Sequence, residues 1–250
     1  MKINILLVFI SSLSGFFPVS GFTTEKIPDR ETSAKAFSLH LGATRVIYSL
    51  ESPGATLTVI NNHNYPMLVQ SVVLTEGKQK YAPFIVTPPL FRLDALQSSR
   101  LKVIRTGGDF PNDRESIQWL CVKGIPPKED DKWAEDQKII NKVSLHVQFS
   151  INNCVKLFIR PESVKGHPDD VAGKIEWHKI GNKIKGVNPT PFYMNLSEIS
   201  VGTQKVNEHN YISPYSSTEY TIPASATGKI SWRVITDYGG LSKQYEAQLK

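Results

Sequence analysis

The sequence predicts an all-β protein, and three observations support this fold class. Short runs of alternating apolar and polar residues, or of β-branched residues, recur along the chain between turn-forming residues. No long segment carries the helical apolar period of an amphipathic helix. A polar stretch near residues 161 to 168 separates the runs into two series. Because short strands at this spacing are typical of β-sandwiches, we expect two sandwich domains.

The first 21 residues predict a cleavable signal peptide. A single cation, Lys2, precedes the apolar run Ile3 to Ile10, and Val19-Ser20-Gly21 fits the small-residue rule for cleavage. This run is too short to span a bilayer, and no later segment is long enough either. A signal anchor is the alternative interpretation. We expect a secreted mature chain that begins near Phe22 and does not insert into a membrane.

The N-terminal series of runs follows a polar start at residues 22 to 36. Asn61 to Asn64, before Tyr65-Pro66, predicts a turn, and Pro88-Pro89 stops or bends a strand. The expected strands are Phe37 to Leu41, Arg45 to Tyr48, Thr56 to Ile60, Pro66 to Leu74, Phe84 to Thr87, Arg100 to Arg105, Ile117 to Lys123 and Val143 to Ile159.

The second series follows a polar linker that contains Gly166 and Pro168. Gly181-Asn182 predicts the turn of a hairpin. The expected strands are Lys174 to Lys179, Lys183 to Val187, Phe192 to Val201, Thr218 to Ile222, Lys229 to Thr236 and Lys243 to Leu249. We therefore divide the chain into a signal peptide (1–21) and two domains (22–161 and 162–250).

The charge of the chain argues against nucleic acid as a partner. The formal net charge of +6 falls to +5 without Lys2, which is the only charged residue of the expected signal peptide. The cations are scattered among acids and form no basic helix or stripe. We interpret the excess charge as a solvated surface.

The familiar templates of catalysis are missing from the sequence. It contains no Gly-x-Ser-x-Gly elbow, no Gly-x-x-x-x-Gly-Lys-Ser/Thr loop and no Gly-x-Gly-x-x-Gly after a strand. The six histidines are dispersed and lack metal-ligand spacing. We expect no enzyme, no cofactor and no bound metal. A hydrolase whose site assembles in space is one alternative.

The segment Val143 to Ile151 alternates strictly between apolar and polar residues. Its apolar face carries no charge or glycine, and its length is at the upper end for a globular strand. The alternation by itself favours an ordinary strand that faces its own core, and a strand that serves a partner is the other interpretation. The apolar positions are Val143, Leu145, Val147, Phe149 and Ile151.

The two cysteines, Cys121 and Cys154, flank a long charged loop, Pro126 to Asn141. A lone pair in an oxidising compartment usually forms a disulfide, with free thiols or a metal site as alternatives. Closing a loop of about 34 residues stabilises a protein by roughly 3 to 4 kcal/mol in the chain-entropy model. Such a bond would hold the base of the loop and of the strand that follows it.

Phe110 to Pro127 reads FPNDRESIQWLCVKGIPP and resembles the signature of periplasmic pilus chaperones of the chaperone–usher pathway. The resemblance covers essentially all of the mature chain. The cysteine pair and the long loop resemble the subfamily with a long loop between strands F and G of domain one. Similar members serve afimbrial adhesins and aggregative-adherence fimbriae. Further agreeing segments are Thr44 to Tyr48, Val86 to Pro89, Lys156 to Pro161 and Thr236 to Gly240.

This resemblance implies two immunoglobulin-like β-sandwich domains that meet at an angle around a cleft. In that family the client is a fimbrial or adhesin subunit that lacks its last strand. The chaperone fills the vacant groove with a strand of its own, which is a form of β-augmentation. The resemblance also implies a periplasmic protein without enzymatic activity, which binds one subunit and delivers it to an outer-membrane usher.

The resemblance assigns three groups of residues. Arg45 and Lys156 match the cleft cations that hold the C-terminal carboxylate of the client, an anion suited to charge-assisted pairing. The apolar positions from Val143 to Ile151 match the donor strand. The interdomain ionic cluster of the family, which we interpret as structural, matches Glu115, Arg160 and Asp237.

An unpaired strand with an apolar face is prone to self-association. We therefore expect the client-free protein to oligomerise or to cover this strand with residues 30 to 41. A secreted two-domain adhesin is the main alternative function. It explains the sandwiches and the signal peptide, but not Arg45 with Lys156 or the signature at Phe110 to Pro127.

Overall fold

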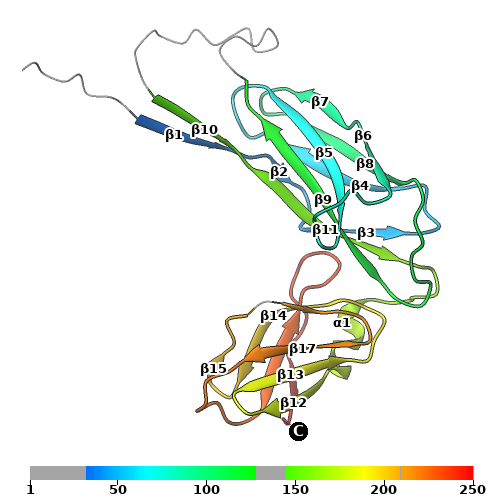
Figure 1. Cartoon of the computed structure of the whole chain (residues 1–250), viewed down its shortest axis with the longest axis vertical. Helices are drawn as coiled ribbons and strands as arrows, with labels where there is room; N and C mark the ends of the chain where they lie inside the picture. The colour runs from blue at the N-terminus through cyan, green and yellow to red at the C-terminus, as the bar shows by residue number, and fades with distance from the viewer. Residues whose placement is uncertain (1–31, 128–144, 209, 250) are drawn as a thin grey trace, which may run out of the picture.

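The computed structural model describes residues 32–127, 145–208 and 210–249 (Figure 1). The expected signal peptide, its cleavage site, Val143 and most of the loop Pro126 to Asn141 lie outside these residues. The described chain folds almost entirely into strands, which form two units, one above the other in Figure 1. None of the described helices is long and apolar enough to cross a membrane. The predicted fold class is confirmed.

The N-terminal unit is a sandwich of two sheets. Its strands are β2 (His40–Leu41), β3 (Arg45–Ser49), β4 (Ala55–Ile60), β5 (Met67–Thr75), β6 (Phe84–Thr87), β7 (Leu90–Leu93), β8 (Ser98–Arg105), β9 (Ser116–Ile125) and β11 (Asn152–Arg160). One sheet has the order β3-β11-β9-β5-β7 and the other β2-β4-β8-β6. Successive side chains of a strand point to opposite faces, so every second one lies between the two sheets. Along β5, Met67 and Val69 are buried, whereas Leu68 and Gln70 are more exposed.

A separate two-stranded sheet extends away from this sandwich (Figure 1). It consists of β1 (Thr32–Phe37) and β10 (Leu145–Ser150), which run parallel in full register along their length. The sequence predicted one continuous strand from Val143 to Ile159, but the strand is interrupted at Ile151. There the N–H of Ile151 donates to the carbonyl oxygen of Phe37 at 2.9 Å, because the chain changes its partner from β1 to β9 at this point.

The C-terminal unit is a second sandwich. Its elements are α1 (Pro168–Val171), a 3-10 turn (Ala172–Lys174), β12 (Glu176–Ile180), β13 (Lys183–Asn188), β14 (Met194–Val201), β15 (Gln204–Lys205), β16 (Tyr211–Ile212), β17 (Ser216–Thr221), β18 (Ile230–Val234) and β19 (Tyr245–Ala247). One sheet has the order β12-β13-β17 and the other β15-β14-β18-β19, with β16 paired to β14. The core packs around the buried rings of Trp177, Tyr220 and Trp232.

The sequence missed α1, all of β1 except Phe37, and the short strands β7, β15 and β16. The two-residue strands are too short to show an alternation that a pattern could detect. The helix lies in the stretch predicted to be a linker. Pro168 begins it, and the N–H of His167 donates to the side chain of Asp170 at 3.0 Å, so the turn is held by local contacts.

Candidate functional site at the domain junction

One face of the sheet β3-β11-β9-β5-β7 is turned toward the C-terminal unit. Lys156 on β11 lies directly opposite Arg45 on β3. Phe158, two residues beyond Lys156, shares its face and packs with Ile117 and with Tyr193, which belongs to the C-terminal unit. We call this contact region the junction.

Arg45 is buried at the junction, with 8% of its surface exposed. Its Nη1 donates to the carbonyl oxygen of Ile235 in the C-terminal unit at 3.1 Å, whereas its buried Nε has no partner among the described residues. Burial lowers the pKa of the guanidinium, and the negative charges of Asp237 and Glu115 act in the opposite direction. Arg45 therefore has an N–H group without a hydrogen-bond partner among the described residues, at a site that is largely shielded from solvent.

Lys156 is partly buried beside Arg45. Its Nζ donates a short hydrogen bond to the side-chain oxygen of Asn195 and lies 4.9 Å from the centre of the Tyr211 ring. Burial, together with the positive charges of Arg45 and Lys78, lowers the pKa of Lys156 to about 8. Neither Lys156 nor Arg45 forms an ion pair within the described chain. Two adjacent cations without a counter-ion suit an anion such as a carboxylate.

A buried ionic cluster links the two units on the same side of the sheet. Arg160, at the end of β11, lies 2.7 Å from an oxygen of Glu115 and 2.8 Å from an oxygen of Asp237. The second oxygen of Glu115 accepts the backbone N–H of Tyr193 at 2.8 Å. The three residues that the resemblance placed in this cluster therefore meet in space, and their charges are paired.

Burial and pairing compete in setting the pKa values of this cluster. Burial raises the pKa of Glu115, although the charge of Arg160 acts against it. Burial would also raise the pKa of Asp237, but hydrogen bonds from Arg160 and His167 bring it below its ordinary value. Arg160, which lies between them, therefore favours the charged form of both carboxylates.

His167 extends the ionic cluster and was not predicted from the sequence. Its Nδ1 lies 2.8 Å from an oxygen of Asp237, and this hydrogen bond raises the pKa of the imidazole. Asn195 and Tyr211, the partners of Lys156, were missed as well. Each of these contacts joins residues far apart in the sequence and follows no local pattern, so no sequence signal could have identified them.

Strand β10 carries three of the predicted donor residues, Leu145, Val147 and Phe149. Its only strand partner within the described chain is β1, so its other edge is unpaired there. Phe149 is 56% exposed and Ile151 40% exposed, which is high for large apolar side chains. Leu145 and Val147 lie on the same strand, and Val143 lies outside the described residues. Residues 32 to 37, within the segment expected to cover this strand, form β1.

The two cysteines form a disulfide at the base of this strand. Cys121 on β9 and Cys154 on β11 are directly opposite each other in the antiparallel pair, and their sulfurs are bonded. The bond therefore closes the segment that leads out from β9 and returns through β10.

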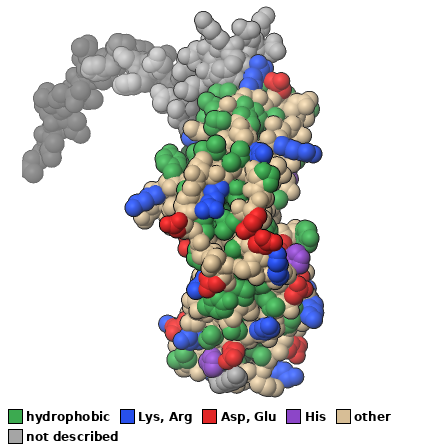
Figure 2. Space-filling model, turned by 90° about the vertical axis from the view of Figure 1, so that its right-hand side faces the viewer, with side chains coloured by type: hydrophobic (Ala, Val, Ile, Leu, Met, Phe, Trp, Pro, Cys, Tyr) green, Lys and Arg blue, Asp and Glu red, His purple; other side chains and the backbone are tan. Residues whose placement is uncertain are grey.

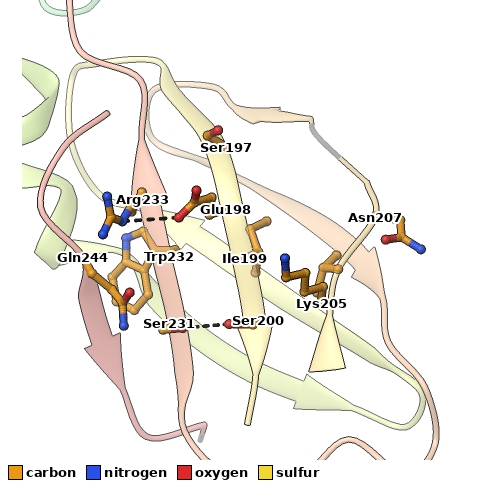
Figure 3. Close-up of a pocket in the computed structure, with 11 residues that line it drawn as sticks. Ser197, Glu198, Ile199, Ser200, Lys205, Asn207, Ser231, Trp232, Arg233 and Gln244 are labelled. Atoms are coloured by element: carbon orange, nitrogen blue, oxygen red, sulfur yellow. Dashed lines mark hydrogen bonds and ion pairs between the residues drawn. The ribbon is translucent and has the colours of Figure 1, made fainter. Parts of the chain in front are cut away.

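A hollow on the C-terminal unit is lined by residues of β14, β15 and β18 (Figure 3). Two pairs of its lining side chains meet across β14 and β18: Glu198 with Arg233 at 3.3 Å, and Ser200 with Ser231 at 2.8 Å. Among the described residues, no group of three His, Cys, Asp or Glu side chains could hold a metal ion.

The surface gives no sign of a nucleic-acid interface on the face shown in Figure 2. Lysine, arginine and acidic side chains are interspersed there over both units, with apolar side chains between them. A continuous basic surface, which nucleic-acid binding requires, is not present on this face.

Comparison with known proteins decides the family. The model described as "Pili and flagellar-assembly chaperone, PapD N-terminal domain" matches residues 38–165, and "Pili assembly chaperone PapD, C-terminal domain" matches residues 170–246. The chain belongs to the PapD-like pilus-assembly chaperones. It is 59% identical to chaperone protein AggD of Escherichia coli over 88% of each chain. It is 56% identical to AfaB of Escherichia coli over 93% of this chain and all of that one.

Solved structures of PapD-like chaperones agree. The Escherichia coli chaperone DraB superposes with a TM-score of 0.79 and 62% identity, covering 88% of this chain and 100% of that chain. A chain of the Salmonella enterica complex between SafA pilin and the SafB chaperone also has a TM-score of 0.79, at 48% identity, covering 87% and 99%. The family predicted from the sequence, and its relation to the afimbrial and aggregative-adherence chaperones, are confirmed.

Proposed function

We propose that this protein is a periplasmic, non-enzymatic chaperone that binds one fimbrial or adhesin subunit and delivers it to an outer-membrane usher. The observation that carries the proposal is β10. Among the described strands β10 pairs only with β1, which leaves its second edge unpaired. Phe149 on β10 and Ile151 just after it are exposed, and β10 leads directly into the strand that carries Lys156. The relative SafB, whose structure is known in complex with the pilin SafA, supports the same role here.

The donor strand would bind the subunit by completing its sheet. Main-chain hydrogen bonds along the free edge of β10 supply affinity, and alternate side chains fill pockets in the groove of the subunit. Burying four or five large apolar side chains contributes on the order of 6 to 15 kcal/mol before the costs of association are subtracted. The assigned side chains are Val143, Leu145, Val147, Phe149 and Ile151.

Arg45 and Lys156 would fix the register of that strand. A carboxylate at the end of the client chain could accept hydrogen bonds from both cations, which have no counter-ion within the described chain. Phe149 is seven residues from Lys156, a span of at most about 23 Å along an extended chain. An anchored carboxylate therefore determines which client pocket lies opposite which donor side chain.

The remaining assignments follow from this function. Residues 1–21 would direct secretion, residues 22–161 would form the subunit-binding domain and residues 162–250 the second domain. Glu115, Arg160 and Asp237 would fix the angle between the domains. Donor-strand binding is a packing and hydrogen-bonding process, so the mechanism requires no cofactor or metal.

Co-expression with a candidate subunit in the periplasm tests the proposal. The chaperone should protect the subunit from proteolysis and co-purify with it in a one-to-one ratio, whereas Arg45→Ala or Lys156→Ala should abolish both effects. Lys102→Ala removes an exposed cation from the opposite sheet and is the matched control. If both junction variants recover the subunit as well as the control, the carboxylate anchor is wrong. An adhesin would protect no subunit in any variant.

A further inference from the structure

A third cation lies in the same row as Arg45 and Lys156. Lys78 belongs to the exposed turn that follows β5, and its Nζ lies 3.7 Å from the centre of the Trp119 ring. Trp119 is directly opposite Lys156 in the pairing of β9 with β11, and residues opposite each other in a sheet share a face. The row therefore continues from Arg45 through Lys156 to Lys78, which lies on the indole ring.

Contacts from both units hold the turn of Lys78 in this position. The Trp119 indole N–H donates to the backbone oxygen of Glu76 at 2.9 Å, and the Tyr211 hydroxyl donates to the carboxylate of Glu76 at 2.8 Å. Tyr211 comes from the C-terminal unit, and its ring also faces Lys156. The turn is thus fixed across the junction by the same tyrosine that contacts Lys156.

The backbone of Lys78 is in a conformation that a lysine rarely adopts. Its φ is +58°, a left-handed region in which glycine is free of strain and other residues are not. In addition, Lys78 has no ion-pair partner among the described residues, although it lies close enough to Lys156 to lower the pKa of that amine. The repulsion between Lys78 and Lys156 would be relieved if an anion bound beside them.

We infer that Lys78 is the third cation of the carboxylate site, and that the hydrogen bond from Tyr211 to Glu76 positions it there. This inference rests on the proposed function, because the carboxylate is that of the client chain. Arg45 is buried and Lys156 is partly buried, so these two cations would bind the carboxylate from the protein side. Lys78 is exposed on its turn, so it meets the anion from the solvent side.

The backbone conformation offers a clean test variant, Lys78→Gly, which removes the cation and suits the local φ. The mature protein would be titrated with acetate, with acetamide as the uncharged control, while NMR follows the Nζ resonance of Lys156. We expect Lys78→Gly to weaken acetate binding about two- to fivefold and to raise the pKa of Lys156. Lys78→Arg should preserve acetate affinity, and Lys80→Ala, which removes a cation from the same turn, should change neither quantity.

Tyr211→Phe tests the positioning contact, because it keeps the ring beside Lys156 and removes only the hydroxyl. We expect Tyr211→Phe to weaken acetate binding, as Lys78→Gly does.

Wild-type acetate affinity and an unchanged pKa of Lys156 in Lys78→Gly would overturn the inference. If Lys78→Gly behaves like the wild type while Arg45→Ala and Lys156→Ala no longer protect the subunit, the inference about Lys78 is wrong and the proposed function stands. If acetate binding depends on Lys78 but no variant affects the subunit, the proposed function fails.

Discussion

Lys156 should make client binding depend on pH above neutrality. Its pKa of about 8 lies far below the ordinary lysine value, because burial and neighbouring cations disfavour the charged form. The protonated amine is the form that binds a carboxylate. Subunit affinity should therefore be constant well below pH 8 and fall as the pH rises through that value, as measured by titration calorimetry. Lys156→Arg should remove this pH dependence, since arginine stays charged.

His167 should contribute a small stabilisation that is present in acid and lost in alkali. Its pKa is raised in the folded protein by Asp237, with Asp170 acting in the same direction and Arg160 against it. Protonation therefore favours the folded state. The gain is complete below the unfolded-state value of about 6.5 and disappears as the pH rises through the folded-state value.

This stabilisation should be less than about 1 kcal/mol, because almost half of the imidazole is exposed to screening solvent. Urea unfolding at mildly acidic and mildly alkaline pH would measure it, with His167→Gln as the comparison. The difference between the two conditions should shrink in the variant. An unchanged difference would mean that other groups dominate the titration.

At the scale of the strand, Phe149 should contribute strongly to client binding and little to the stability of the chaperone. Its side chain is 56% exposed, so Phe149→Ser should change the free energy of unfolding by less than about 0.5 kcal/mol. The same change should weaken subunit binding about ten- to hundredfold, because the ring would be fully buried in the complex. Ile180→Ser, which alters a similarly exposed apolar residue of β12, should leave subunit binding unchanged. Equal binding by both variants would exclude Phe149 from the interface.

Sequence patterns predicted most strands because each buries one face and therefore alternates. They did not predict the break at Ile151: the strict alternation ends there, before Asn152-Asn153, but only the change of partner from β1 to β9 separates β10 from β11. The same alternation also could not distinguish a core strand from a donor strand. That distinction came from the resemblance, and the exposure of Phe149 and Ile151 now supports it physically.

At the scale of the whole molecule, Arg160 should be decisive for stability. Arg160→Ala would leave Glu115 and Asp237 buried without their common partner, which should lower the free energy of unfolding by about 3 to 5 kcal/mol. Urea denaturation would measure the loss. Arg92→Ala breaks an exposed ion pair with Asp94 and should cost less than about 1 kcal/mol. Similar losses in both variants would contradict a structural role for the cluster.

Contacts between the domains were the part of the site least accessible to sequence reasoning. The resemblance identified Arg45, Lys156 and the ionic cluster because these residues lie within matching motifs. Asn195, Tyr211 and Lys78 lie outside any such motif, and they reach the junction only after both sandwiches have folded and docked. Their roles depend on tertiary geometry, which no local period encodes.

The position of the disulfide also affects how such a chaperone can diverge. Of the buried residues in the main core of the described N-terminal unit, only Val122 lies between Cys121 and Cys154. Among the described residues of the intervening segment, the contacts to this core are therefore few, chiefly those of Val122 and of Gly124, which packs against Met67 and Leu39. We expect sequence variation among relatives to concentrate there. A chimaera that carries this segment from a second relative should then prefer the client of that second relative.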